Sequence, residues 1–568
     1  MFRTTYIVLI LICIAPTIPG LLGVLLSSLG YVPPVGLFEL SLSNYKAFFS
    51  WPGINHSIVL TLFSSIASTY LACFICFAVL QKLWLGKHWS KLEVLLAPLL
   101  AMPHVAFAIG FAFLFAPTGM IARILAETSD LIPDTQNVTW FVHDPHAIGL
   151  TVALTLKEIP FLLLMSIPIL QQLKIDKIHK VSTSLGYSPV EMWWKAIFPL
   201  WLVKMRFALF AVIAYGVSVV DLSLILGPTN PPTLAVLVWQ WFNDPDLSLL
   251  PRAASGAVML FLIASSLLIF VVITEKTLVG PLGRWQFSGR HGTNLPGKTL
   301  FAFSVVVSGV MLPLMMIWSI AHRWRFPDIL PSRYSLRFWN NEWDNIWPTI
   351  NHSLIIAMTT ACISLLLAVL AHEYRLRFKV CLPKYIIALP MLIPQLSILF
   401  GIQITSLYLL DSSYYLGVIW SHIFFAFPLV YLALDGPWQS YNNKYSKVGL
   451  SLGKTPLSVF FKIKVKLLMP ALWYAWAVGA SVSLAQYLPT LMLGGGRITT
   501  VTTEAVALSS GFDRRVTAIY ALWQALLPFI FFATAMIMSI IVRRRNGYRC
   551  TNKETLSRDT VARKHHHL

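Results

Sequence analysis

The segments INHSIVLTLFSSIAS at residues 54–68 and INHSLIIAMTTACIS at residues 350–364 are two versions of one sequence, and they begin 296 residues apart. A repeat of this kind in a chain of 568 residues predicts two related halves. The offset falls along the chain because the first half carries an extra outside loop at about 117–146, where the second half has only a few residues near Asp411. Further matches continue the repeat: Pro103 and Gly110 with Pro394 and Gly401, Pro160 with Pro428, and SLGYSP at 184–189 with SLGKTP at 451–456.

The composition places both halves in a lipid bilayer. Hydrophobic residues make up 57% of the chain and charged residues 12%, and the mean hydropathy is +0.70. Soluble domains contain about 25% charged residues, and a soluble core of ordinary size would not hide this much apolar surface. We therefore expect an all-α integral membrane protein with about twelve transmembrane helices, arranged as two parallel six-helix repeats. The predicted helices cover residues 5–29, 56–80, 92–116, 147–170, 205–227, 252–275, 299–321, 351–372, 385–410, 414–434, 471–492 and 517–542.

The basic residues predict the orientation. With the N-terminus in the cytoplasm, the inside segments hold 32 of the 43 Lys and Arg residues and the outside loops hold 10, whereas 13 of the 23 acidic residues lie outside. This positive-inside pattern predicts a multi-pass protein with both termini in the cytoplasm. The net charge of +20 then reflects topology and contact with anionic lipid headgroups, and it requires no nucleic acid.

The repeat and the topology together predict the domain organisation. Each half forms one transmembrane domain with a long inside loop between its fourth and fifth helices. The expected parts are a first domain at 1–275 with its loop at 171–204, a cytoplasmic linker at 276–298, a second domain at 299–545 with its loop at 436–470, and a basic cytoplasmic tail at 546–568.

The two inside loops share a pattern. The first reads KVSTSLGYSPVEMWWKAIFPL at 180–200, and the second reads KVGLSLGKTPLSVFFKIKVKLLMP at 447–470. Glycine allows a sharp turn that other residues resist, and proline suits the first turn of the next helix. We expect a helix–turn–helix projecting from the membrane in each half, with exposed aromatic residues as anchors for a partner. The candidate residues are Gly186, Ser188, Pro189, Trp193, Trp194, Gly453, Thr455, Pro456, Phe460 and Phe461.

At these residues the chain resembles the permease subunits of binding-protein-dependent ABC importers. The signature of that family is the EAA loop, roughly E-A-A-x-x-x-G, followed by I-x-L-P. The resemblance implies that Gly186 and Gly453 are the loop glycines, and that about 184–196 and 451–463 are the helices that couple to an ATPase. The departures are Lys180-Val181-Ser182 and Lys447-Val448-Gly449 in place of the EAA triplets, and Lys466, followed by Pro470, at the position of Pro199.

The resemblance also implies partners and a location. The chain would be a transport pore and no enzyme, with two copies of a cytoplasmic ABC ATPase bound to its loops and a periplasmic solute-binding protein at its outer face. ATP and Mg would bind the ATPase, and this chain would hold no cofactor. The expected location is the bacterial inner membrane.

The substrate prediction has two sources. Fused two-half permeases resemble the thiamine and iron(III) importer branch, and residues 487–515 are most similar to its thiamine-type members. Ionisable groups inside membrane helices are costly and often functional. The candidate pathway residues are Asp221, Glu158, Gln395, Gln403 and Gln486, of which the acids would suit a cationic solute. A structural role is the alternative, with Glu158 paired to Lys157 and Asp221 bonded to backbone near a helix end.

Two motifs are interpreted as coincidental. Residues 292–299 read GTNLPGKT, which matches the Walker A pattern, but a basic linker precedes them and a membrane helix follows at once. Cys73 and Cys76 form a C-x-x-C inside an apolar helix, where packing explains them better than redox or metal chemistry. We expect no metal site and no disulfide.

Two other classes of protein remain as alternatives. A secondary transporter with two six-helix repeats would use an ion gradient and need no ATPase. Its characteristic basic loops would follow the second and eighth helices, whereas the matched motifs here follow the fourth and tenth. A membrane-embedded enzyme would require paired catalytic groups, and the sequence contains no H-E-x-x-H and no paired carboxylates on facing helices. The outside loop at 117–146 is either a contact for a binding protein or a solvated insertion.

Overall fold

The computed structural model describes residue 4 and residues 15–86, 89–129, 141–378, 384–409, 413–511 and 513–545. The first part of the first predicted helix, the connection near Asp411 and the predicted tail at 546–568 lie outside the described residues.

Helices dominate the described residues, and ten helical segments are long and apolar enough to cross a membrane. The helices α2 (Thr17–Ser28) and α19 (Gln395–Leu409) are shorter, and they lie where the first and ninth spans are expected. The all-α membrane fold is therefore confirmed. The ten segments are built from α4 (Ile54–Leu83), α6 (His104–Phe115) with α7 (Met120–Ser129), α8 (Ile148–Leu173), α10 (Pro189–Met192) with α11 (Phe198–Ser218), α14 (Leu250–Val279), α15 (Gly297–Ile320), α16 (Arg337–Phe378), α20 (Tyr414–Ser440), α22 (Pro456–Val459) with α23 (Val465–Ala485), and α26 (Arg514–Arg545).

Four predicted spans are broken helices. The span predicted at 385–410 consists of α17 (Lys384–Ile387), α18 (Leu389–Leu392) and α19, and Ile393 before Pro394 is extended. The span predicted at 92–116 consists of α5 (Trp89–Ala101) and α6, because Pro103 lacks an N–H group and adopts an extended backbone before His104. The span predicted at 205–227 consists of α11 and α12 (Asp221–Leu226). The span predicted at 471–492 consists of α23 and α24 (Leu488–Gly494). Breaks at membrane depth are tolerated where the freed backbone groups find partners within the protein.

The breaks occur at matching places in the two halves. Val219 and Gln486 are 267 residues apart, and each is the extended residue that ends the longer helix. This is the same offset that relates the two inside loops. The alignment pairs Asp221, the first residue of α12, with Leu488, the first residue of α24, so the acid has an apolar counterpart.

The predicted boundaries differ most at α16. This helix begins at Arg337, well before the predicted start at 351, and contains Pro348. A two-stranded antiparallel hairpin, β1 (Ala321–Arg323) and β2 (Arg333–Tyr334), connects α15 to α16 and was not predicted. The strands are too short to show the alternating pattern by which strands are recognised in sequence.

The halves exchange their first helices. The helix α2 of the first half packs on α19 of the second, and α15 of the second half packs on α4 and α6 of the first. Glycine makes both contacts close: a Cβ on Gly110 of α6 would lie 2.7 Å from the Cβ of Met311, and one on Gly401 of α19 would lie 1.7 Å from the carbonyl oxygen of Gly20. Small residues at membrane helix crossings allow such close approach.

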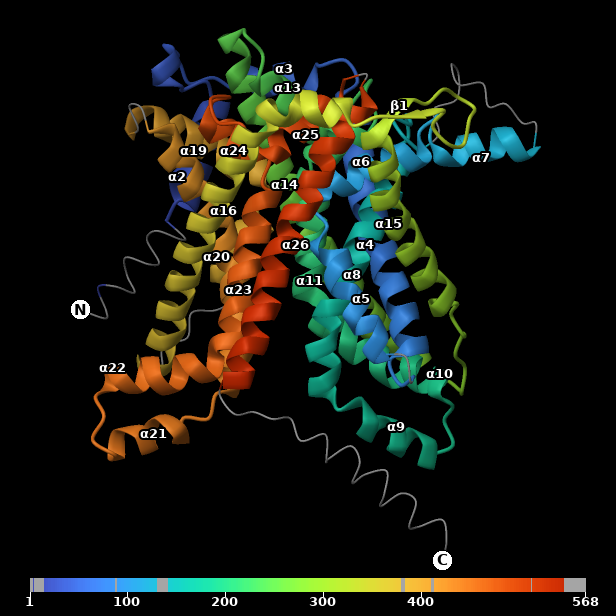
Figure 1. The fold of residues 1–568 in the computed structure, drawn as a ribbon, viewed down its shortest axis with the longest axis vertical. Coiled ribbons are helices and arrows are strands. Elements are labelled where there is room, and N and C mark those ends of the chain that lie inside the picture. The colour runs from blue at the N-terminus through green and yellow to red at the C-terminus, as the bar shows by residue number, and fades with distance from the viewer. Residues whose placement is uncertain are drawn as a thin grey trace, which may run out of the picture.

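The helices run broadly side by side between two ends (Figure 1). At one end, α9 (Ile175–Ser184) with α10 and α21 (Lys444–Ser451) with α22 form two separate projections. The elements α7, α13 (Leu234–Phe242), α25 (Val501–Ser509) and β1 lie at the opposite end.

Candidate functional site

The two inside loops have the predicted helix–turn–helix form. Gly186 follows α9 with φ of +78°, and Gly453 follows α21 with φ of +76°, a left-handed conformation that favours glycine. The side-chain oxygen of Ser188 accepts a hydrogen bond from the Glu191 backbone N–H at 3.3 Å, and Thr455 caps the second loop by accepting one from Ser458 at 3.3 Å. Pro189 and Pro456 open the short helices α10 and α22 that follow these caps.

Each short helix continues through a π-helical turn into a membrane helix. These turns are η2 (Trp193–Ile197), which leads into α11, and η5 (Phe460–Lys464), which leads into α23. Each loop is thus covalently continuous with the broken span of its own half, because α11 leads to Asp221 and α23 leads to Gln486. A displacement of either loop would therefore act directly on the break.

Of the aromatic residues predicted to be exposed, Phe461 is exposed and Trp193 is not. Phe461 is 57% exposed, whereas Trp193 is 1% exposed and packs edge-on against Phe77 of α4. Trp194 and Phe460 are half-buried. Trp194 donates a hydrogen bond from its indole N–H to the backbone oxygen of Thr293 at 2.9 Å. The tryptophans therefore hold the first loop to the body of the protein.

The exposed apolar residues of the loops are aliphatic, and the sequence reasoning missed them. Val181 is 59% exposed and Leu185 60% in the first loop, and their counterparts Val448 and Leu452 are 57% and 73% exposed. Both pairs have a spacing of four residues, so the two side chains share one face of the loop helix. The signal was present in the sequence, because K-V-x-x-S-L-G occurs in both loops at the same offset of 267.

The linker covers only the first loop. The Arg290 guanidinium donates hydrogen bonds to the backbone oxygens of Leu185 at 3.1 Å and Gly186 at 3.2 Å, and it lies 5.0 Å from the centre of the Tyr187 ring. At the matching turn, a Cβ on Gly453 would meet no atom within 4 Å in the part of the chain that the structure describes. The two loops thus share one backbone geometry and differ in their surroundings.

The Walker A-like stretch is held against α4. Gln81 donates a hydrogen bond to the backbone oxygen of Thr293 at 3.1 Å and accepts one from the Leu295 N–H at 2.9 Å. Gly297 begins α15 so close to α4 that a Cβ on it would lie 2.0 Å from the Ala78 oxygen. Because a phosphate-binding loop requires free backbone N–H groups around an open space, this stretch is not built to bind nucleotide.

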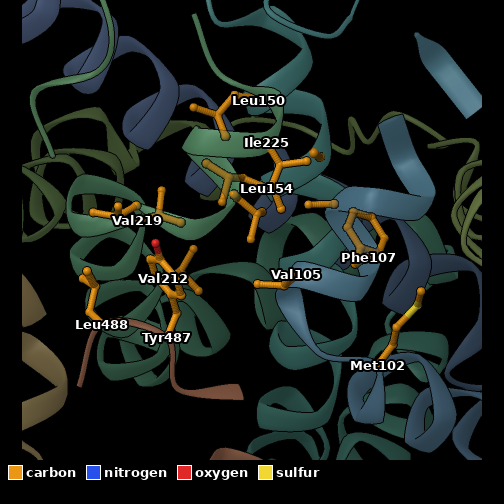
Figure 2. Packing of buried hydrophobic residues seen from close by; sticks show 14 of the residues in the cluster. Met102, Val105, Phe107, Leu150, Leu154, Val212, Val219, Ile225, Tyr487 and Leu488 are labelled. Atoms are coloured by element: carbon orange, nitrogen blue, oxygen red, sulfur yellow. The ribbon is translucent and has the colours of Figure 1, made fainter. Parts of the chain in front are cut away.

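Two of the five predicted pathway residues lie near each other. Asp221 at the start of α12 and Glu158 on α8 are both within electrostatic range of the Tyr215 phenol, and Asp221 is also within range of Tyr487 from the second half. Figure 2 shows Tyr487 and Leu488 in the same buried apolar region as Val212 and Val219. Asp221 therefore lies where the two halves meet, and Glu158 lies on α8 within the first half.

The other three predicted residues belong to the second half. Gln486 is buried in the break between α23 and α24, where it donates a hydrogen bond to the His422 backbone oxygen at 3.2 Å. Gln395 is the first residue of α19. Gln403, two turns later, lines a cavity of about 440 Å³ with Trp239 and Phe242 of α13.

Lys157 has a structural role in addition to its electrostatic interaction with Glu158. Its ammonium group donates hydrogen bonds to the backbone oxygens of Met102 and Leu99, at the break between α5 and α6. Lys157 thereby satisfies carbonyl groups that the break removes from helical bonding. In the second half, His422 bridges a different break, because its ring nitrogens lie 2.8 Å from the hydroxyls of Ser483 and Thr490, on either side of the break between α23 and α24.

Together, an all-helical membrane body made of two related halves, with one helical loop projecting from each, defines a two-domain transport pore. No family model matches the chain. The chain is 31% identical over 512 residues to the inner membrane ABC transporter permease protein YnjC of Escherichia coli (strain K12), covering 90% of this chain and 93% of that protein.

Two weaker similarities agree with the first. The thiamine transport system permease protein ThiP of Haemophilus influenzae is 22% identical over 487 residues, which cover 80% of this chain and 84% of that protein. The spermidine/putrescine transport system permease protein PotC homolog of Mycoplasma genitalium is 29% identical over 177 residues, which cover 30% of this chain and 62% of that protein.

The chain belongs to the ABC transporter permeases. It is a multi-pass inner membrane protein of the importer kind, a pore component rather than an enzyme, and permeases of this family work with an ATPase and a binding protein.

Proposed function

We propose that the chain forms the whole transmembrane pathway of an ATP-driven importer for a small organic cation. One ATPase subunit docks on each loop, at Val181 and Leu185 in the first half and at Val448 and Leu452 in the second. A binding protein delivers the solute at the opposite end. The observation that carries the proposal is the matched pair of capped helical loops, each of which continues into a broken span.

The loops supply the mechanical link. When the two ATPase subunits close on ATP, they draw α9–α10 and α21–α22 together, and α11 and α23 carry this motion to the breaks at Val219 and Gln486. The ATPase and the binding protein bias the conformations of the permease because they bind one of them better than the other. The positive-inside pattern supports a cytoplasmic location for the loops and both termini.

An organic cation is supported by the chemistry of the site and by the relatives. Asp221 places an acid at the boundary between the halves, with Glu158 and the aromatic rings of Tyr215 and Tyr487 nearby. Acids and aromatic faces both attract cations. The two relatives whose names give a substrate are named for thiamine and for spermidine/putrescine.

The test is uptake into proteoliposomes that contain this chain, its ATPase and its binding protein. The proposal expects ATP-dependent accumulation of radiolabelled thiamine or spermidine, with two ATPase copies for each permease chain by mass measurement. Accumulation of iron(III) with neither amine transported would refute the cation class. Uptake driven by a proton or sodium gradient without ATP would establish the secondary transporter instead.

A further inference from the structure

A basic cavity of about 510 Å³ lies at the end of the molecule opposite the paired loops. Its lining includes four arginines from three separate parts of the chain: Arg123 of α7, Arg323 of β1, and Arg514 and Arg515 at the start of α26. The first of these belongs to the first half and the other three belong to the second. The cavity is therefore formed only when the two halves are assembled.

The cavity is lined by more positive than negative side chains. Asp513 forms an ion pair with Arg515, with a distance of 2.8 Å between carboxylate oxygen and Nε. Partial burial opposes ionisation of this carboxyl group, but hydrogen bonds from Arg515 hold the pKa of Asp513 below its ordinary value, so the pair stays charged. Within the described ranges, Arg123, Arg323 and Arg514 have no acidic side chain at ion-pair distance. Three guanidinium charges are left without an ion-pair partner, although the nearby Asp328 carboxylate partly offsets the charge of Arg123.

Hydrogen bonds fix the side chains of Arg123 and Arg514, and each guanidinium group still has unused N–H donors. Arg123 is 3% exposed and donates three hydrogen bonds to backbone oxygens, those of Thr118 at 3.1 Å, Arg325 at 2.8 Å and Asp328 at 2.7 Å. Arg514 donates to the hydroxyl of Thr118 at 2.6 Å and to its backbone oxygen at 3.2 Å. A guanidinium group has five N–H donors. Each side chain therefore keeps free N–H groups.

Tryptophan rings pack against the guanidinium groups of Arg123 and Arg514. The Arg123 guanidinium lies 4.9 Å from the centre of the Trp324 ring, and that of Arg514 lies 5.3 Å from the centre of the Trp318 ring. These cation–π contacts stabilise charges that would otherwise be costly to bury. The arrangement is a preformed site for an anion, because its donors are ordered before any ligand arrives.

The surroundings identify which anion fits. The helix α15 ends at this cavity, and its side chains Val306 and Met316 are 61% and 59% exposed, as expected of a surface that faces lipid. Tryptophan side chains are typical of the headgroup level of a membrane, where Trp318 and Trp324 would lie. The adjoining helix α7 extends sideways from the bundle (Figure 1). The cavity thus opens at the depth where lipid phosphates lie.

We propose that this cavity binds the phosphate of an anionic lipid headgroup, in the leaflet opposite the paired loops. Arginine forks match the oxygen atoms of a phosphate and bond them in pairs. Because Arg123 comes from one half and Arg514 from the other, a bound phosphate would join the two halves at this end. The proposal does not depend on which solute the permease carries.

The test is native mass spectrometry of the delipidated full-length chain in detergent, titrated with phosphatidylglycerol or phosphatidylcholine. Wild type is expected to bind phosphatidylglycerol in preference. Each basic group contributes about 1 kcal/mol to such binding, so Arg323→Gln and Arg514→Gln should each weaken it about fivefold. Within the described residues the Arg323 side chain forms no hydrogen bond, so its variant should keep the fold. The matched control is Arg333→Gln, at its exposed partner on the same hairpin.

Each outcome decides the proposal. Loss of phosphatidylglycerol in Arg323→Gln with retention in Arg333→Gln supports it. Equal binding of both lipids in all variants overturns it. If millimolar inorganic phosphate displaces the lipid, the site takes phosphate from either source. If inorganic phosphate binds and phosphatidylglycerol does not, the lipid occupant is wrong. If the variants weaken binding-protein association and leave lipid binding unchanged, the site receives acidic side chains and the lipid proposal is refuted.

Discussion

Gly401 and Gly20 are in backbone contact across the two halves, and a Cβ on Gly401 would lie 1.7 Å from the Gly20 carbonyl oxygen. The equivalent glycine of the first half, Gly110, packs closely against the Met311 side chain of α15. The repeat thus preserves a glycine at the place where each half accepts the first helix of the other. Sequence comparison of the halves identified the pair, and the structure supplies the reason for it.

The variant Gly401→Ala should destabilise the protein, because α2 and α19 would have to move apart. Overpacking of a tight contact costs about 1–3 kcal/mol. Thermal unfolding in detergent measures the effect. The control is Gly309→Ala, where an added Cβ meets nothing within 4 Å among the described residues and the helix gains up to about 1 kcal/mol. Equal melting temperatures for the two variants would show that the crossing is looser than described.

The variant Leu452→Asp should weaken ATPase binding at least tenfold, which corresponds to about 1.4 kcal/mol. The reason is that Leu452 is 73% exposed on the second loop and would be desolvated in a docked complex. Co-purification with the ATPase measures the change. Leu330→Asp is the control, since Leu330 is 58% exposed and lies between β1 and β2, and β1 is at the opposite end of the molecule (Figure 1). A similar loss in both variants would argue against docking at the loop.

The variant Arg290→Ala should loosen the first loop and leave the second unchanged. The Gly186 and Tyr187 amides should exchange with solvent several-fold faster, because the Arg290 hydrogen bonds to this turn are lost. Hydrogen exchange of the purified chain measures this, and the Gly453 amide is the internal control. Arg284→Ala, an exposed change in the same linker, should have no effect. Equal exchange at both turns would contradict the asymmetry.

The variant Asp221→Asn should slow uptake of the organic cation about tenfold or more while ATPase binding stays intact. Removal of the negative charge at the boundary between the halves weakens the attraction for a cation. Radiolabelled uptake into proteoliposomes measures the rate. Asp246→Asn is the matched control, because Asp246 is exposed and its carboxylate only caps Ser248. Unchanged transport by Asp221→Asn would remove this residue from the pathway.

The variant Lys298→Ala should leave ATP-dependent uptake unchanged. A Walker A lysine contacts nucleotide phosphates, and its loss would abolish hydrolysis. Here the preceding backbone is bonded to Gln81, so Lys298 has no phosphate site to complete. The same proteoliposome assay tests this. Loss of ATP turnover in this variant would require nucleotide to bind the linker.

Short-range residue preferences account for the turns and caps of the two inside loops. The turns at Gly186 and Gly453 were predicted from residue preferences within a few positions, and the caps at Ser188 and Thr455, which were not predicted, follow from preferences of the same short range. The apolar spans follow from length and hydropathy. Burial of Trp193 does not, because it depends on Phe77, which lies more than a hundred residues earlier in the chain.

Long-range arrangement produced the features that the sequence did not reveal. A continuous apolar run does not indicate whether a membrane helix is broken, and the break at Val219 has no proline beside it. The basic cavity gathers Arg123, Arg323 and Arg514 from segments roughly two hundred residues apart, so no window of sequence contains it. The outside loop predicted at 117–146 contributes Arg123 to this cavity, a role that neither expectation for it included.

Because the halves exchange their first helices, they should stay associated when the chain between them is cut. Each half holds the leading helix of the other, through α2 on α19 and α15 on α6, so the peptide between the halves is not what keeps them together. If a protease cut the exposed bond between Ser288 and Gly289, the two fragments would remain one particle. If two separate genes encoded the halves, each half would have to find the other during membrane insertion. The fused chain avoids this search, because one translation event produces both halves.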